Sequence, residues 1–223
     1  MKKRIGPSLA QLLFPESAGS GAKRFAELGL AEDAERVCRL KFSEGNEHTD
    51  ICLQIHTDYV RLVSLLDSDP YTYTLKDPAA VKRACYTLFG CKEDAVPAKP
   101  SGAGLLLSRV RFAELEAAAH KHTLLYLAEQ LRAETGDLVS SAHLANALKY
   151  QTCRGELHFY GYGENGWEPS RASYIENGNG GWLLRISGNP AEDWMIAIPA
   201  EKPHVCAALY AWTAFHTPVL TAE

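Results

Sequence analysis

The sequence predicts an α+β fold with a mainly antiparallel sheet and flanking helices. Apolar residues alternate with a period of two in several segments, as in half-buried strands, and two of these segments lead into helix starts marked by proline. This order of elements occurs twice, so we expect two pseudo-symmetric halves, each with helix, strands and helix. The halves are predicted at about 24–92 and 106–216 within a single domain, 1–223, and are joined by a Pro/Gly linker at 93–104.

The first half carries two strong local signals. The Leu-Lys-Phe run at 40–42 is predicted to end a helix, and the apolar residues of 51–55 then alternate as a strand. A further extended run, 71–75, precedes Asp77 and Pro78. Asp is a favoured N-cap, and Pro is tolerated at the first helical position because no backbone donor is needed there. This pair therefore predicts the start of the helix that closes the first half.

The second half repeats this plan after a longer helix. A stripe of apolar residues predicts that helix at about 109–135, with Gly136 as its stop and polar caps for a further helix at 137–141. The Leu-Lys-Tyr run at 148–150 echoes the run at 40–42 and is likewise followed by alternating strand residues.

The remaining strands of the second half are marked by turn residues. The segment 177–181, Asn-Gly-Asn-Gly-Gly, predicts a hairpin turn between strands at 172–175 and 182–186, because Asn and Gly tolerate positive φ. An extended run at 194–198 then leads to a proline-marked helix start at 199–203.

Composition excludes several functional classes. Apolar residues make up 46% of the chain and charged residues 22%, as in an ordinary globular protein. The net charge of -4 argues against a general nucleic-acid surface, which needs a dense field of Lys and Arg. No segment approaches the roughly 20 apolar residues of a membrane-spanning helix, and the N-terminal residues do not resemble a signal peptide. We expect a cytoplasmic protein that binds neither nucleic acid nor membrane.

The cysteines support the same compartment. The chain has six of them at irregular spacing, without a Cys-x-x-Cys pair. Such a pattern is typical of reduced core residues in a chain of this length, and not of a disulfide framework. We expect all six thiols to be free: Cys38, Cys52, Cys85, Cys91, Cys153 and Cys206.

One motif resembles a cofactor site. The segment 161–166, Gly-Tyr-Gly-Glu-Asn-Gly, has the glycine spacing of a dinucleotide-binding loop. That loop works only where a strand precedes it and a helix follows, so that helix amides meet a pyrophosphate. Here a second extended run follows the glycines. We therefore predict a strand-to-strand connection and no cofactor.

Histidine and cysteine give no clear catalytic or metal site. His143, Cys153 and His158 have no recognisable ligand spacing, so a structural or solvent-facing role is favoured over zinc binding. His204 and Cys206 are two residues apart in a predicted helix and point in different directions, which disfavours a catalytic pair. We expect neither catalytic residues nor metal ligands.

Aromatic residues of the second half suggest a different kind of site. Most of them lie on or beside strands and fit a core. Tyr and Trp also combine a large contact area with a polar group, as protein-binding surfaces require. We predict that a partner docks on the residues near the glycine-rich connections: Tyr160, Tyr162, Trp167, Asn177 and Asn179.

The end of the second half carries a family resemblance. The segment 181–185, Gly-Trp-Leu-Leu-Arg, leads to 194–199, Trp-Met-Ile-Ala-Ile-Pro, and a final helix. Together with the duplicated plan, this ending resembles the EspG family of ESX (type VII) secretion chaperones. The resemblance implies two quasi-symmetric halves around a central sheet, and a cytosolic protein that binds secreted proteins without catalysis.

Three functions are compatible with these residues. We expect a non-enzymatic protein-binding module, a cytosolic chaperone or adaptor for a secreted partner. An immunity protein that occludes a bacterial toxin is the alternative in the same class, since a compact acidic protein suits a basic toxin. A small-molecule enzyme that uses a His or Cys of the second half is the alternative of another class.

Overall fold

The computed structural model describes residues 34–66, 71–95, 104–163, 166–187 and 191–214, with the backbone alone for 161–163, 166–169 and 214. Its strands are β1 (Arg36–Glu44), β2 (Glu47–Ile55), β3 (Val60–Ser64), β4 (Thr72–Leu75), β5 (Leu105–Leu107), β6 (Cys153–Gly163), β7 (Gly166–Asn177), β8 (Gly180–Ile186) and β9 (Met195–Pro199). Its helices are α3 (Pro78–Thr87), α4 (Arg109–Ala118), α5 (Leu124–Thr135), α6 (Leu138–Lys149) and α7 (Lys202–Ala214).

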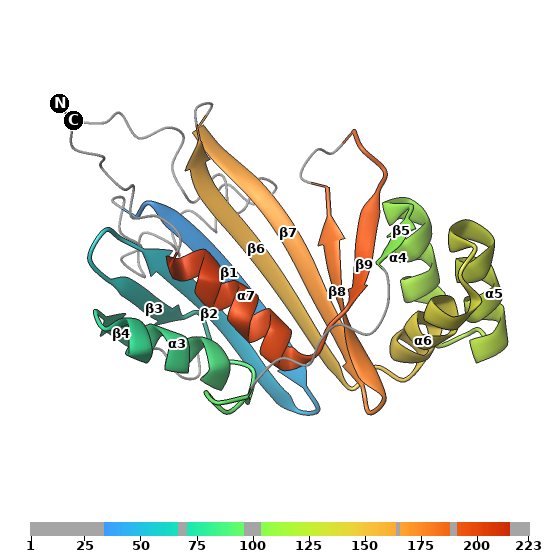
Figure 1. Cartoon of the computed structure of the whole chain (residues 1–223), viewed down its shortest axis with the longest axis horizontal. Coiled ribbons are helices and arrows are strands. Elements are labelled where there is room, and N and C mark those ends of the chain that lie inside the picture. Colours follow the sequence, from blue (N-terminus) through green and yellow to red (C-terminus); the bar gives the residue numbers. More distant parts are fainter. Residues whose placement is uncertain (1–33, 67–70, 96–103, 164–165, 188–190, 215–223) are drawn as a thin grey trace.

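The nine strands form one antiparallel sheet in the order β4-β3-β2-β1-β6-β7-β8-β9-β5. Helices α3 and α7 lie across the sheet at the β1–β4 end, and α4, α5 and α6 gather at the β5 end (Figure 1). The predicted α+β class, with an antiparallel sheet and flanking helices, is confirmed.

The two halves of the chain contribute strands in a related order. Strands β1 to β4 follow one another across the sheet and lead into α3, while β6 to β9 do the same and lead into α7. The halves meet where β1 pairs with β6, from Arg36 opposite Gly161 to Glu44 opposite Cys153. An internal duplication in a single domain stays a prediction. The predicted start at residue 24 and linker residues 96–103 lie outside the described residues.

Residues 40–42 belong to β1, so the prediction that they end a helix is wrong. The strand pairs with β2 on one side and β6 on the other, and both Val37 and Cys38 are fully buried although they face opposite ways. Burial on both faces hides the period of two, and the same apolar spacing also fits a helix. The similar run at 148–150 ends α6. The two runs therefore do not occupy equivalent places in the structure.

The helix predicted over 109–135 is two helices, α4 and α5, separated by residues 119–123. The Thr123 side chain caps α5 by accepting from Tyr126 N at 3.2 Å. Lys149 Nζ donates to three carbonyl oxygens of the break at 2.6 to 3.2 Å. These partners satisfy backbone groups that a continuous helix would have bonded internally, so the break is stable without Gly or Pro.

The predicted caps are confirmed. Asp77 Oδ1 accepts from Ala79 N at 3.2 Å at the start of α3. Gly136 ends α5 with φ 75°, a left-handed conformation that favours glycine. Asp137 then caps α6 by accepting from Ser140 N at 2.9 Å.

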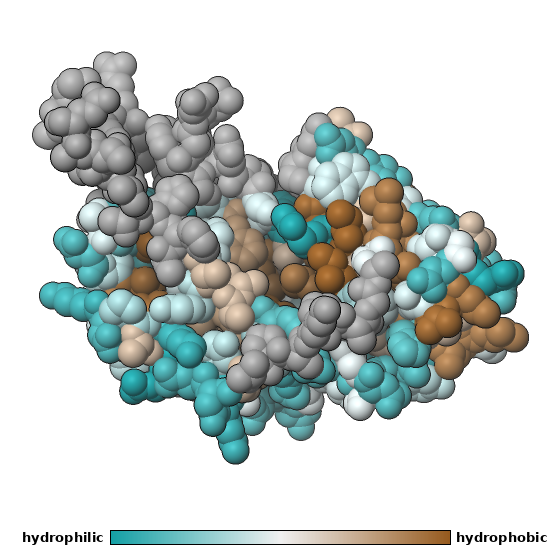
Figure 2. All heavy atoms as spheres, in the orientation of Figure 1, coloured by the Kyte–Doolittle hydropathy of each residue, from teal (hydrophilic) through white to brown (hydrophobic). Residues whose placement is uncertain are grey.

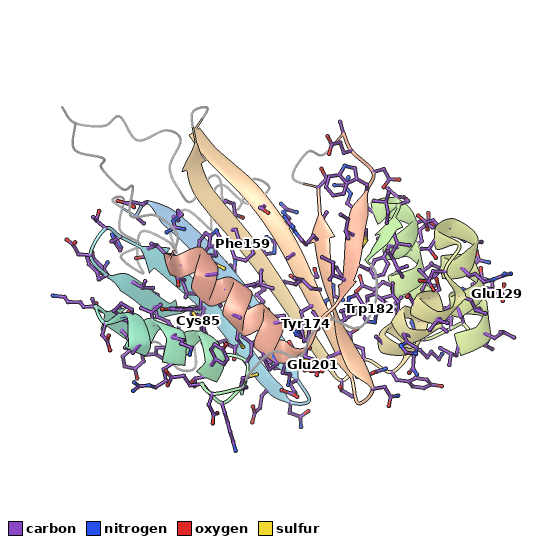
Figure 3. All side chains as sticks on the ribbon, in the orientation of Figure 1. Cys85, Glu129, Phe159, Tyr174, Trp182 and Glu201 are labelled. Carbon is purple, nitrogen blue, oxygen red and sulfur yellow. The ribbon has the colours of Figure 1, made fainter. Side chains whose placement is uncertain are left out.

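The sheet carries two cores on opposite faces. Tyr174 belongs to the first core, beneath α3 and α7, and its neighbour Ile175 belongs to the second, which α4, α5 and α6 cover. Successive strand residues point to opposite faces. Figure 3 shows Tyr174 beside α7 and Trp182 toward the helices at the β5 end. Each helical group therefore covers a different face of the same sheet.

All six cysteines are free thiols, and five of them are buried. Cys38, Cys85, Cys153 and Cys206 lie in the first core, while Cys52 is buried on β2. These positions agree with the predicted role as small core residues.

Candidate protein-binding surface

The β6–β7 hairpin extends past its neighbours as a two-stranded ribbon, which we define as residues 161–163 and 166–170 (Figure 1). The β1–β6 pairing stops at Gly161, and the β7–β8 pairing begins at Arg171. The β6–β7 pairing continues to Gly163 opposite Gly166. The glycine-rich segment therefore connects two strands, as predicted, and no helix follows it.

Two of the predicted binding residues lie on this ribbon. Tyr162 and Trp167 are paired directly across its strands. Their side chains lie outside what the structure describes. Tyr160, one step nearer the sheet on the same side of β6, is only 5% exposed, and burial raises the pKa of its phenol. The ribbon therefore leaves the sheet at a buried tyrosine.

The other two predicted residues lie at the far end of β7. Asn177 is 6% exposed, and its Nδ2 donates to Asn146 Oδ1 on α6 at 3.0 Å. Its Oδ1 accepts from Asn179 N at 2.9 Å, which shapes the β7–β8 turn. Asn177 lies ten residues after Trp167 along β7, a length of about 34 Å. The structure thus places the five predicted residues at two separate ends of the sheet.

The remaining aromatic residues of the second half divide between core and surface. Phe159 packs on Trp212 of α7, with ring centroids 4.9 Å apart, and Tyr174 and Trp182 are buried. Trp194, in contrast, is 40% exposed, and its Nε1 donates to Glu192 at 2.8 Å. Most of these aromatics serve the core, in agreement with the sequence-based interpretation.

A second surface was not found from the sequence. We define the open face as the side of β8, β9 and β5 that faces away from α4, α5 and α6; its members are Leu106, Leu183, Arg185, Ile196 and Ile198. Leu106 is 64% exposed, while the isoleucines are half-buried and belong to neither core. Figure 2 shows apolar residues gathered between α7 and β5.

The open face has a single charged member. Arg185 lies opposite Ile196 of β9 and Ala172 of β7, and it is exposed. Within the described part of the chain, no carboxylate pairs with its guanidinium. The face therefore combines an apolar surface with one available cation.

A closed ion-pair cluster lies where β1, β7 and α7 meet. Lys202 Nζ lies 2.6 Å from Glu44 and 3.5 Å from Glu176. Burial raises the pKa of Glu176, and the Lys202 charge opposes that rise. Burial acts to lower the pKa of Lys202, but the hydrogen bond to Glu44 and the Glu176 charge outweigh it. The charges satisfy one another, so this cluster holds the start of α7 in place.

The buried thiols are poorly suited to nucleophilic chemistry. Burial raises the pKa of Cys52, Cys85 and Cys153 to about 12, and it raises the pKa of Cys206 as well. A thiolate, and not a thiol, is the reactive species. These four residues therefore stay protonated near neutral pH.

The structure does not bring the two histidines considered as ligands together. His143 is exposed on α6, whereas His158 lies on β6 with its Nε2 3.9 Å from Glu156. Across the described ranges, no group of three or more His, Cys, Asp and Glu side chains is placed to hold a metal ion. In the same ranges, no helix is both long and apolar enough to cross a membrane.

The fold is similar to that of a known chaperone. No protein-family model matches the sequence, and no curated protein matches it. Among solved structures, the chain resembles the type VII secretion system chaperone EspG5 of Mycobacterium tuberculosis, determined in complex with a PE25-PPE41 dimer. The TM-score is 0.57 at 12% sequence identity, over 85% of this chain and 75% of that chain. At this identity the likeness concerns the fold alone.

Proposed function

We propose that this chain is a non-enzymatic protein-binding module, a cytosolic chaperone or adaptor of the EspG kind for a secreted protein. The observation that carries the proposal is the fold similarity to EspG5, which extends over 85% of the chain. That protein is a secretion chaperone whose structure is known in complex with a protein dimer. Fold alone does not define function, so the proposal also depends on the surface of this chain.

Two surface features support protein binding. The ribbon extends beyond the pairing of its neighbouring strands, and the open face leaves several apolar side chains in contact with solvent. Contiguous exposed apolar surface is typical of interaction sites in soluble proteins. The protonated thiols give less support to a cysteine-dependent enzyme.

In this proposal the ribbon supplies the anchors. Tyr162 and Trp167 are cross-strand neighbours and would present two large rings at one place. Tyr160 and Asn177 are buried and would hold the strands that carry the surface. Asn179 lies in the exposed turn at the other end of β7 and would contact only a partner that spans the sheet.

Purification and an export assay in the source organism test this function together. Tagged chain should co-purify at fixed stoichiometry with a protein that the cells export, and deletion of the gene should lower export of that protein at least about fivefold. The matched control is a strain that carries the gene with Leu125→Ser, a change at an exposed position of α5.

Two results would contradict the chaperone proposal. If the bound protein is a toxin whose activity the chain suppresses, the immunity alternative is correct. If no protein binds and the chain instead converts a small molecule, with loss of turnover on substitution of a second-half His or Cys, it is an enzyme.

A further inference from the structure

The open face is the part of the apolar sheet surface that the described helices leave uncovered. On the same face, α3 and α7 bury residues of β1 to β3 and part of β6 and β7 in the first core. Behind β8, β9 and β5, the helices α4, α5 and α6 form the second core. Leu183 touches the first core, so the open face continues directly from the surface that α7 covers.

The dimensions of this surface match one helix. Three neighbouring strands, β8, β9 and β5, span two strand spacings, about 10 Å. An α-helix with its side chains is about 10 to 12 Å wide. The sheet already packs α7 on this same side, so another helix beside α7 would repeat a packing arrangement that the fold uses.

The charge pattern restricts the chemistry of that helix. Arg185 is exposed between Leu183 and the cross-strand Ile196, and it lacks an acidic partner within the described residues. Covering the face with a purely apolar helix would desolvate this guanidinium without compensation. A carboxylate on the incoming helix would pair with it, and arginines in such positions are frequent anchors of protein interfaces.

We propose that the open face binds an amphipathic helix of the exported partner, with an apolar stripe against Leu106, Ile196 and Ile198 and an Asp or Glu against Arg185. The inference rests on the proposed chaperone function and adds the recognition chemistry. The apolar stripe would recur every three to four residues along the helix, and the carboxylate would lie at the edge of that stripe.

Photo-crosslinking in the source organism tests the proposal. The probe is p-benzoylphenylalanine at position 106, and the matched control is the same probe at position 125 on α5, since the replaced leucines are 64% and 71% exposed. We expect position 106 to crosslink to a helical peptide of the exported protein that carries an apolar stripe and a carboxylate. Position 125 should give at least about fivefold less of this product.

A charge exchange provides the second test. Arg185→Glu should lower the crosslink yield at position 106 at least about fivefold without changing the thermal midpoint, because the residue is exposed. Reversal of the partner's carboxylate to Lys should restore the yield in the Arg185→Glu background.

The outcomes separate the two proposals. If the exported protein co-purifies but crosslinks equally at both positions, through an extended segment, or independently of Arg185, the open face is not a helix site while the chaperone function stands. If position 106 crosslinks only to the chain itself, the inference is also wrong. If no exported protein is bound at all, both proposals fail.

Discussion

The two ends of the sheet use the same side of the strands differently. At the β1–β4 end, α3 and α7 cover that side and bury residues such as Leu40 completely. At the β8–β9–β5 end, the same side carries Ile196 and Ile198 in half-buried positions, because α4, α5 and α6 pack on the reverse. One continuous sheet thus provides a covered surface that stabilises the fold and a surface that the described helices leave uncovered, which is the one we propose for a partner.

The largest expected effect separates the covered from the open surface by stability. Leu40→Ala should lower the free energy of unfolding by about 2 to 5 kcal/mol, since it leaves a cavity among fully buried neighbours. Ile198→Ala should cost less than about 1.5 kcal/mol, because part of that side chain is already in water. Urea denaturation measures both, and equal losses would contradict the distinction.

A second prediction concerns the boundary between these surfaces. A Cβ atom on Gly181 would lie 2.4 Å from Tyr174 Oη and 2.5 Å from the Ala200 carbonyl oxygen. Gly181→Ala should therefore cost about 1 to 3 kcal/mol, as overpacking generally does. Gly178→Ala in the same turn is the control, because its Cβ would meet nothing within 4 Å. Thermal denaturation should give a clearly lower midpoint for Gly181→Ala than for Gly178→Ala. Similar midpoints would show that the boundary is loosely packed.

A third prediction moves from stability to binding. Trp167→Ala on the ribbon should leave the thermal midpoint nearly unchanged and weaken binding of the exported partner at least about tenfold, or about 1.4 kcal/mol. Calorimetry of folding and titration of the complex give the two values. Severe unfolding would mean that Trp167 belongs to the core, and unchanged affinity would mean that the partner docks elsewhere.

The smallest expected effect is a pH dependence beside the second core. The His158 imidazole, whose Nε2 lies 3.9 Å from the carboxylate, and the charge of Arg154 lower the pKa of Glu156 from 4.5 to about 2. A carboxyl whose pKa falls on folding contributes stability that is complete above pH 4.5 and is lost as the pH falls toward 2. Arg154 also pairs with Glu116 of α4 at 2.9 Å, so this cluster joins the helices to the sheet.

Unfolding measurements at several pH values check this contribution. Glu156→Gln should make the free energy of unfolding fall less steeply between pH 4.5 and pH 2 than in the wild type. Glu47→Gln, at the exposed start of β2, is the control. Parallel profiles for Glu156→Gln and the wild type would contradict the role of this carboxylate.

Local chemical signals in the sequence predicted local structure well. Asp77 with Pro78 and Gly136 with Asp137 mark helix ends through their own backbone preferences, and each acts as expected. The hairpin turn at 177–181 is correct for the same reason. These residues decide their conformation with few distant contacts.

Elements that depend on distant contacts were missed. The strand β1 is defined by its partners β2 and β6, and its burial on both faces removes the alternation that marks a strand. The three residues of β5 are too few to show any period. The break between α4 and α5 at 119–123 contains neither Gly nor Pro. It is stabilised by the Thr123 cap and by Lys149, which is 26 residues further along the chain than Thr123.

The candidate surface was only partly predictable. Exposed turns follow from glycine content, so the ribbon and the turn at 177–181 were found. The open face was not, because Ile196, Ile198 and Leu183 have the alternation of ordinary core strands. Which side of a strand remains uncovered depends on where helices pack, and neither composition nor periodicity contains that information.

Hydrogen–deuterium exchange of the free chain and of its complex with the exported partner tests the central claim most directly. Binding should slow exchange in the ribbon and in the strands of the open face at 105–107, 180–186 and 195–199, while α3 and α7 stay unchanged. Protection confined to α3 and α7, with the open face and the ribbon exchanging as in the free chain, would contradict the account.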